Sequence, residues 1–159
     1  GGGLTTTMID YLVKNISIRL RKVGLNSQIK IRDEHMAILA TRCTEIRELQ
    51  LFGVFGITNN SLDHIMKGLC KLEKLDISLA EINLMKILEL RSMPELQTLN
   101  CQHIRIIGDI EKLIKSLPHL IINQKSFQIA DRSQLLTPIK GFWDVHAGVV
   151  QDTFALCSQ

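Results

Sequence analysis

The sequence has few aromatic residues and little excess charge of either sign. Phe, Trp and Tyr together make up 4% of its 159 residues, and the formal net charge is 19 − 16 = +3. Domains that bind nucleic acid usually concentrate much more positive charge on one face, so the composition argues against that class. Hydrophobic residues make up 45% of the chain, which excludes disorder as a description of the whole.

Long apolar runs and cysteine pairs are also absent. No apolar run approaches the roughly 18 residues of a membrane span, so we expect no transmembrane helix and no membrane partner. The N-terminus lacks the basic and apolar regions of a signal peptide, and no CxxC pair occurs among Cys43, Cys70, Cys101 and Cys157. We therefore expect free, buried thiols and an intracellular location, either cytoplasmic or nuclear.

Recognisable metal-binding and catalytic motifs are missing from the sequence. The five histidines do not complete a four-ligand zinc pattern with the cysteines. No GxSxG, glycine-rich phosphate loop, HExxH or paired-carboxylate signature occurs. The sequence thus predicts a protein that is not an enzyme, holds no metal ion and needs no cofactor.

Leucine and isoleucine are abundant instead, with 23 and 21 copies, and they recur at fixed offsets. A short apolar motif appears five times, first at intervals of 26 residues and then of 24. The copies are Leu20-x-x-Val23-x-Leu25, Ile46-x-x-Leu49-x-Leu51, Leu72-x-x-Leu75-x-Ile77, Leu96-x-x-Leu99-x-Cys101 and, in degenerate form, Leu120-x-x-Asn123-x-Lys125. Such periodicity indicates a repeat architecture.

Each repeat has a strand half and a helix half. The end of the motif has the period-two spacing of a strand with one buried face. The following residues carry apolar side chains three and four positions apart, as in the stripe of Leu62, Ile65, Met66 and Leu69, which indicates a helix. Such a unit cannot bury its apolar face alone, so stacked units are expected to form an α/β solenoid. Its parallel sheet would line the concave side, with the helices on the convex side.

The segment from Asp33 to Leu51, DEHMAILATRCTEIRELQL, resembles the cysteine-containing leucine-rich repeat, whose unit runs roughly ITDxxLxxLxxxCxxLxxLxL. The resemblance covers about residues 20–125 and places Cys43 at the cysteine position. It implies a short horseshoe of leucine-rich repeats. The subtype is similar to the substrate-recognition part of F-box ubiquitin-ligase receptors, which recruit targets to a Cullin–Skp1 ligase. This implies binding to Skp1 only if an F-box lies outside this chain.

The repeat divides the chain into three parts. Residues 1–19 form a leader and an N-terminal capping helix or partial repeat. Residues 20–125 form repeats that start near 20, 46, 72, 96 and 120, and residues 126–159 form a C-terminal cap or tail. Because the chain begins in mid-unit, we expect either a fragment of a longer protein or a short solenoid with a helical cap. In the tail, Phe142 and Trp143 are candidate partner-binding residues, whereas a simple end cap is the alternative.

The concave row is the main candidate site. It consists of the strand residues that point away from the buried leucines. Its charges are few and mixed, which suits a protein or peptide partner and not a phosphate backbone. Phe52 would be its apolar anchor, unless it packs against Phe55. The row comprises Lys22, Asn26, Glu48, Gln50, Phe52, Lys74, Asp76, Ser78, Thr98, Asn100 and Gln102, with Gly24 among them and Gln124 as a further candidate.

Three functions remain open from the sequence. The leading one is a non-enzymatic interaction module that recognises a protein or peptide through the concave face, as in an F-box-type receptor. The second is a scaffold or adaptor subunit of a stable complex that docks through the aromatic tail. The third is a nucleic-acid-binding solenoid, suggested by basic residues in the N-terminal third, for which a solvated face is the simpler interpretation. These basic residues are Lys14, Arg19, Arg21, Lys22, Lys30, Arg32 and Arg42.

Overall fold

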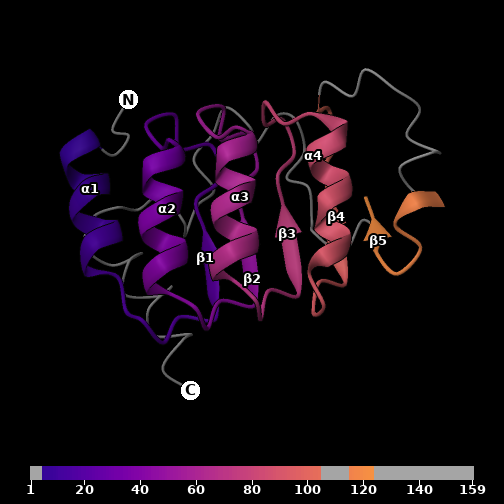
Figure 1. Cartoon of the computed structure of the whole chain (residues 1–159). Coiled ribbons are helices and arrows are strands. Elements are labelled where there is room, and N and C mark those ends of the chain that lie inside the picture. The colour runs from indigo at the N-terminus through magenta and orange to yellow at the C-terminus, as the bar shows by residue number, and fades with distance from the viewer. Residues whose placement is uncertain (1–4, 105–114, 124–159) are drawn as a thin grey trace.

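The computed structural model describes residues 5–104 and 115–123, in which helices alternate with short strands (Figure 1). The four α-helices of this part are α1 (Thr6–Asn15), α2 (Asp33–Arg42), α3 (Asn59–Gly68) and α4 (Leu84–Leu88), and the 3-10 helix η1 (Glu89–Ser92) continues α4. Its strands are β1 (Lys22–Gly24), β2 (Glu48–Gln50), β3 (Lys74–Asp76), β4 (Thr98–Asn100) and β5 (Ile121–Ile122).

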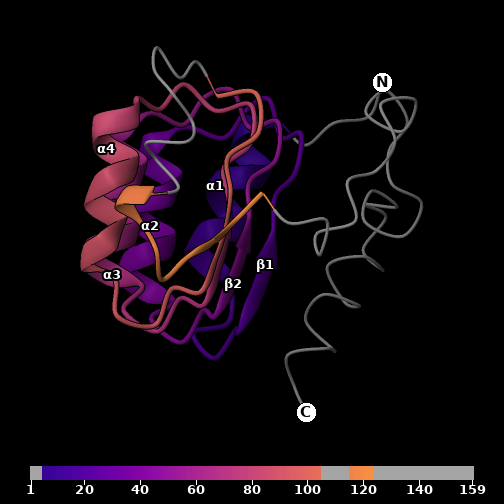
Figure 2. The same ribbon diagram turned by 90° about the vertical axis from the view of Figure 1, so that its right-hand side faces the viewer.

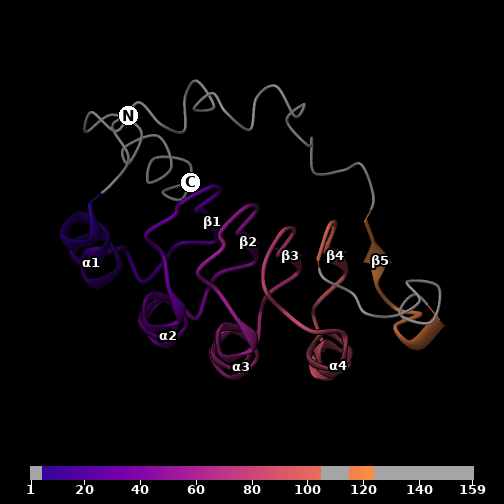
Figure 3. The same ribbon diagram turned by 90° about the horizontal axis from the view of Figure 1, so that it is seen from above.

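The described strands form one parallel sheet in the order β1-β2-β3-β4-β5. The helices lie side by side against one face of this sheet, so the described part of the molecule has two layers (Figures 2 and 3). The architecture is an α/β fold of the leucine-rich-repeat type. Among the residues that the structure describes, no helix has the length and apolar character needed to cross a membrane.

The strand register follows the sequence offsets through β4. Val23, Leu49, Leu75 and Leu99 lie opposite one another in adjacent strands, at intervals of 26, 26 and 24 residues. At β5 the register differs from the 24-residue offset, because Ile122 and not Asn123 pairs with Leu99. The degenerate copy has asparagine where the others have an apolar residue, and the adjacent isoleucine takes the position opposite Leu99.

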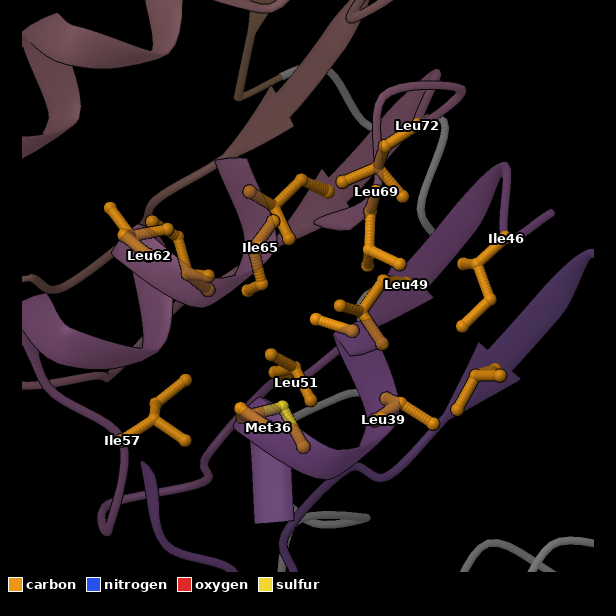
Figure 4. Close-up of a cluster of buried hydrophobic side chains, with 14 of the residues drawn as sticks. Met36, Leu39, Ile46, Leu49, Leu51, Ile57, Leu62, Ile65, Leu69 and Leu72 are labelled. Carbon is orange, nitrogen blue, oxygen red and sulfur yellow. The ribbon is translucent and has the colours of Figure 1, made fainter. Parts of the chain in front are cut away.

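The core lies between the two layers. Leu49 and Leu51, within and directly after β2, point toward Met36 and Leu39 of α2 and Ile65 of α3 (Figure 4). All five side chains are at most 1% exposed. The buried side chains of the helices and strands belong to one hydrophobic cluster, which extends along the solenoid.

Gly68 allows α3 to approach α2 closely. A Cβ atom at this position would lie 2.3 Å from the carbonyl oxygen of Ala40 and 3.0 Å from its Cβ. Only glycine fits this contact, because a carbon atom and a carbonyl oxygen cannot approach to that distance. The small residues Ala40 and Gly68 therefore help to set the spacing of adjacent helices.

Helix α1 covers the N-terminal end of the core with Ile9 and Val13. His35, which is 1% exposed, joins it to α2. The Nδ1 atom of His35 accepts a hydrogen bond from the backbone N–H of Arg32 (2.9 Å), and its Nε2 atom lies 3.1 Å from Oδ1 of Asp10. A neutral ring protonated at Nε2 satisfies both contacts.

Polar side chains link the N-termini of successive helices. The carboxylate of Asp33, the first residue of α2, accepts hydrogen bonds from the backbone N–H (2.8 Å) and hydroxyl (2.7 Å) of Thr58 and from the hydroxyl of Ser61. Asn59, the first residue of α3, accepts from the backbone N–H of Asn83 (3.1 Å). The first residue of each of these two helices thus binds the N-cap residue of the next.

Replacing Leu49 with aspartate should abolish folding. The side chain is completely buried, so the substitution places an unpaired carboxylate in the apolar core. The cost should approach the total stability of a domain, which is about 5–15 kcal/mol. Thermal melting followed by circular dichroism checks this, with exposed Thr44→Asp as the matched control. A Leu49→Asp variant that melts like the parent would contradict the register described above.

Replacing Asp33 with asparagine should lower stability by about 1–2 kcal/mol at pH 7, because the charged acceptor of three hydrogen bonds is lost. Burial raises the pKa of Asp33, but the hydrogen bonds from Ser61 and Thr58 outweigh burial and hold its pKa below the ordinary value. The carboxylate therefore stabilises the fold above pH ~4, and this contribution disappears as the pH falls through the lowered folded-state pKa.

Urea denaturation between pH 7 and pH 2.5 measures this difference. The difference in the free energy of unfolding between the parent and the Asp33→Asn variant should become smaller as the pH falls. Glu34→Gln removes a charge from the same helical turn at an exposed position and serves as the control. A gap independent of pH would show that the carboxylate's charge does not contribute.

Candidate functional site

The strands place the concave row on the face opposite the helices. Val23, Leu49, Leu75 and Leu99 point into the core, so the residues before and after each of them point to the other side of the sheet. Parallel pairing aligns the row across strands. Lys22, Glu48, Lys74 and Thr98 are opposite one another, as are Gly24, Gln50, Asp76 and Asn100.

The concave row is exposed at its N-terminal end. Lys22 and Lys74 are exposed, and the residues of intermediate exposure are Asn26, Glu48, Gln50, Phe52 and Gln102. We call the six of these in the first three repeats the open half of the row: Lys22, Asn26, Glu48, Gln50, Phe52 and Lys74. Gln124, the further candidate, lies outside the described residues.

The expectation of an exposed row is wrong for four of its members. Asp76, Ser78, Thr98 and Asn100 are 5%, 2%, 7% and 1% exposed. Strand alternation determines the face on which a side chain lies, but it does not determine what covers that face. These four residues form a buried polar cluster.

Hydrogen bonds and one ion pair link the side chains of the open half in the first two repeats. The amide of Asn26 donates to Oε1 of Gln50 (3.2 Å), and the amide of Gln50 donates to Oε1 of Glu48 (2.8 Å). Glu48 also forms an ion pair with Lys22, with Nζ 3.4 Å from Oε2. Asn26 Oδ1 accepts from the backbone N–H of Phe52 (3.0 Å), which ties the loop after β2 to the preceding repeat.

The buried polar cluster has its own hydrogen bonds. The carboxylate of Asp76 accepts from the backbone N–H of Ser78 (2.9 Å) and from the amide of Asn100 (3.3 Å). The hydroxyl of Ser78 accepts from the backbone N–H of Gln102 (3.1 Å). No described residue donates to Oδ1 of Asn100, although this atom is buried. Burial raises the pKa of Asp76 above its ordinary value, and the hydrogen bonds from Ser78 and Asn100 offset this only in part.

The described cysteine thiols differ in their exposure to solvent. Cys43 and Cys101 are buried and Cys70 is exposed, and all three are free, whereas Cys157 lies outside the described residues. Burial raises the pKa of Cys43 and raises that of Cys101 to about 11, so both stay protonated at neutral pH.

Within residues 5–104 and 115–123, no three His, Cys, Asp or Glu side chains gather as metal ligands. The predicted tail residues Phe142 and Trp143 fall outside the described part.

One feature of the exposed surface was not predicted from the sequence. Ile29 and Phe55, in the loops that follow β1 and β2, are 64% and 58% exposed. They occupy the same position in adjacent repeats, because 29 + 26 = 55. Their shared offset was visible in the sequence, but the apolar pattern gave no indication that these two side chains point outward.

No protein-family model and no curated protein matches the sequence. Solved structures of similar fold include the following two. The first is the leiomodin-1 actin-binding site 2 (ABS2), with a TM-score of 0.56 and 19% identity, covering 76% of this chain and 79% of that one. The second is the tropomodulin C-terminal domain of Caenorhabditis elegans, with a TM-score of 0.54 and 11% identity, covering 98% and 96%.

These neighbours correct the assignment to the cysteine-containing, F-box type of repeat, which is wrong. The similar structures are leiomodin and tropomodulin domains, not F-box receptors. Leu69, Met93 and Leu117 occupy the position of Cys43 in the later repeats, and all four are buried. This position requires only a buried apolar side chain, so one cysteine there does not identify the subtype. The expectation of Skp1 as a partner rested on that subtype and is withdrawn with it.

Replacing Asp76 with asparagine should leave stability at pH 7 unchanged or raise it. The variant removes a buried charge and keeps an acceptor for the Ser78 N–H. If the Asn100 amide rotates by 180°, its unpartnered oxygen accepts from the new amide. A raised folded-state pKa means that ionisation of Asp76 opposes folding, so the parent should gain stability as the pH falls toward ~4.

Urea denaturation at pH 7 and pH 5 checks this expectation. Asp76→Asn should lack the pH-dependent gain, and Asp76→Ala, which leaves the Ser78 N–H without an acceptor, should be less stable at both values. An Asp76→Asn variant as unstable as the alanine variant would show that the carboxylate stabilises this cluster as an ion.

Proposed function

We propose that this chain is a non-enzymatic protein-binding module that recognises a protein or peptide through the open half of the concave row. The observation that carries the proposal is the row's geometry. Polar side chains of the first two repeats are linked by hydrogen bonds and one ion pair on one sheet, beside the exposed Lys74 of β3. Side chains that are already ordered lose little conformational entropy when a partner binds.

The mixture of groups in the open half suits a protein surface. Lys22, Glu48 and Lys74 alternate in sign along one row of paired residues, and Asn26 and Gln50 supply both donors and acceptors. Phe52 supplies the apolar contact around which such interfaces are usually built. This combination supports a partner with complementary polar groups and an apolar side chain for Phe52.

Several observations support a function without catalysis. The buried thiols of Cys43 and Cys101 stay protonated, and the carboxylates of Asp33 and Asp76 are used in hydrogen bonds of the fold itself. The free thiol of Cys70 suits the reducing interior of the cell, where we place the module.

The charged surface does not favour nucleic acid. Carboxylates pair with Lys22, Arg47, Lys71 and Lys86 across or within repeats, which leaves an interspersed pattern of charge. A phosphate backbone requires a concentrated basic face.

The fold neighbour named as an actin-binding site makes actin the first protein partner to test, as an analogy at the level of fold.

The triple variant Gln50→Ala, Phe52→Ala, Lys74→Ala should lose the partner. Affinity capture from a cell extract with quantitative mass spectrometry, together with cosedimentation with filamentous actin, compares it with the parent. Removing a central apolar anchor and two polar contacts should weaken specific capture about tenfold or more.

The control variant changes two exposed helical residues on the other face, Arg42→Ala and Lys67→Ala. It should capture the same proteins as the parent. Melting temperatures confirm that both variants fold. If the folded triple variant retains every partner of the parent, recognition does not use the open half and the proposal fails.

A further inference from the structure

A second surface lies at the edge of the sheet where β1 and β2 lead into α2 and α3, at the upper ends of these helices in Figure 1. We call it the loop-edge surface, and it consists of Ile29, Lys30, Arg32 and Phe55. The exposed apolar side chains Ile29 and Phe55 sit at equivalent positions of adjacent repeats. Paired strands are about 4.8 Å apart, so equivalent loop positions lie close together.

Arg32 is held between these two loops. Its Nη1 atom donates hydrogen bonds to the carbonyl oxygens of Ile29 (2.6 Å) and Ile31 (2.9 Å). The same Nη1 atom lies close to the loop that contains Phe55, because a Cβ atom at Gly56 would be 2.4 Å from it. The guanidinium group is therefore held between the two loops that carry the exposed side chains of Ile29 and Phe55.

The remaining edge of the guanidinium group is available for binding. Arg32 is exposed and its side-chain hydrogen bonds to described residues all come from Nη1, so no described residue accepts a hydrogen bond from Nε or Nη2 or forms an ion pair with Arg32. The adjacent carboxylate of Asp33 is already bound to Thr58 and Ser61. The Nε and Nη2 donors form a planar fork that matches the two oxygens of a carboxylate.

We propose that the loop-edge surface binds an acidic segment of a protein partner in which an Asp or Glu is flanked by apolar residues. The carboxylate binds the Nε–Nη2 edge of Arg32, and Lys30 adds a second positive charge beside it. The flanking apolar side chains cover Ile29 and Phe55. This site is separate from the concave row, so it does not depend on recognition there.

The ordering of Arg32 strengthens this site. An exposed arginine normally loses rotamer freedom when it binds a carboxylate, which offsets much of the gain. Two backbone carbonyls already fix Arg32, so that loss has occurred during folding. When apolar side chains of the partner cover Ile29 and Phe55, they also keep water away from this contact, which strengthens the charge-assisted hydrogen bonds.

Selection from a displayed library of random 12-residue peptides tests the proposal with the full chain as bait. The enriched peptides should carry an Asp or Glu between apolar residues. Their affinity should fall about tenfold or more with Arg32→Gln and with Phe55→Ser. Arg32→Lys should bind nearly as weakly as Arg32→Gln, because lysine keeps the charge but lacks the fork.

Two controls establish whether peptide binding is specific to the loop-edge surface. Met85→Ser removes an apolar side chain that is 71% exposed on α4, and it should leave peptide binding unchanged. Phe52→Ala alters the concave row and should also leave it unchanged, so failure of one proposal is distinguishable from failure of the other. Melting curves establish that each variant is folded, and Phe55→Ser leaves the contacts of Arg32 in place.

Three results would overturn the proposal. The first is that no peptide is enriched. The second is that the enriched peptides lack acidic residues or bind Phe55→Ser as tightly as the parent. The third is that Arg32→Lys retains full affinity, which would mean that the planar fork is not what the peptides recognise.

Discussion

The stacking of equivalent leucine positions against one another is the contact on which the rest of the structure depends. Val23, Leu49, Leu75 and Leu99 lie in register beneath the sheet, and none is more than 4% exposed. A single repeat has only one strand and one helix and cannot remove these side chains from water. Each repeat is therefore stable only between neighbours, and a substitution in one layer affects the layers on both sides.

Apolar contacts are not directional, so stacking alone does not fix the position of one helix along its neighbour. Polar contacts between successive repeats, at the two edges of the sheet, restrict this movement. Asp33 and Asn59 each bind the N-cap residue of the following helix. At the opposite edge, Glu45 pairs with Lys71 in the next repeat, with Nζ 2.7 Å from Oε1. Exposed ion pairs contribute little free energy. The partly buried, multiply bonded Asp33 is therefore the stronger of these links between α2 and α3.

The sequence predicts the strands well because the pattern that specifies them is local and repeated. It fails at β5, where Asn123 replaces the apolar residue and Ile122 pairs with Leu99 instead. The burial of Asp76 and Asn100 on the concave face was not predictable from the sequence. The alternation of side chains along a strand shows on which face of the sheet each one lies, but it does not show what covers that face. The tail residues fall outside the part of the chain that the structure describes.

Backbone conformation after the strands was equally hidden from the sequence. Ser27, Gly53, Leu79 and His103 all have positive φ, one in each of the first four repeats. Only one of them is glycine, the residue that usually marks this conformation. In three of these repeats, hydrogen bonds of the backbone N–H groups explain the positive φ. Those of Ser27, Gly53 and Leu79 donate to carbonyl oxygens of the next repeat, so tertiary pairing imposes a conformation that the residue type does not favour.

The two candidate surfaces differ in how many new hydrogen bonds and apolar contacts a partner can form there. In the open half of the concave row, Asn26, Gln50 and Glu48 already bond to one another, so a partner must replace contacts that exist. Such a surface discriminates between partners, because only one with matching donors and acceptors replaces these hydrogen bonds. At the loop edge, Arg32 is fixed by one nitrogen and keeps two donors for a ligand beside exposed apolar side chains. A partner there gains hydrogen bonds and apolar burial without breaking a contact within the chain.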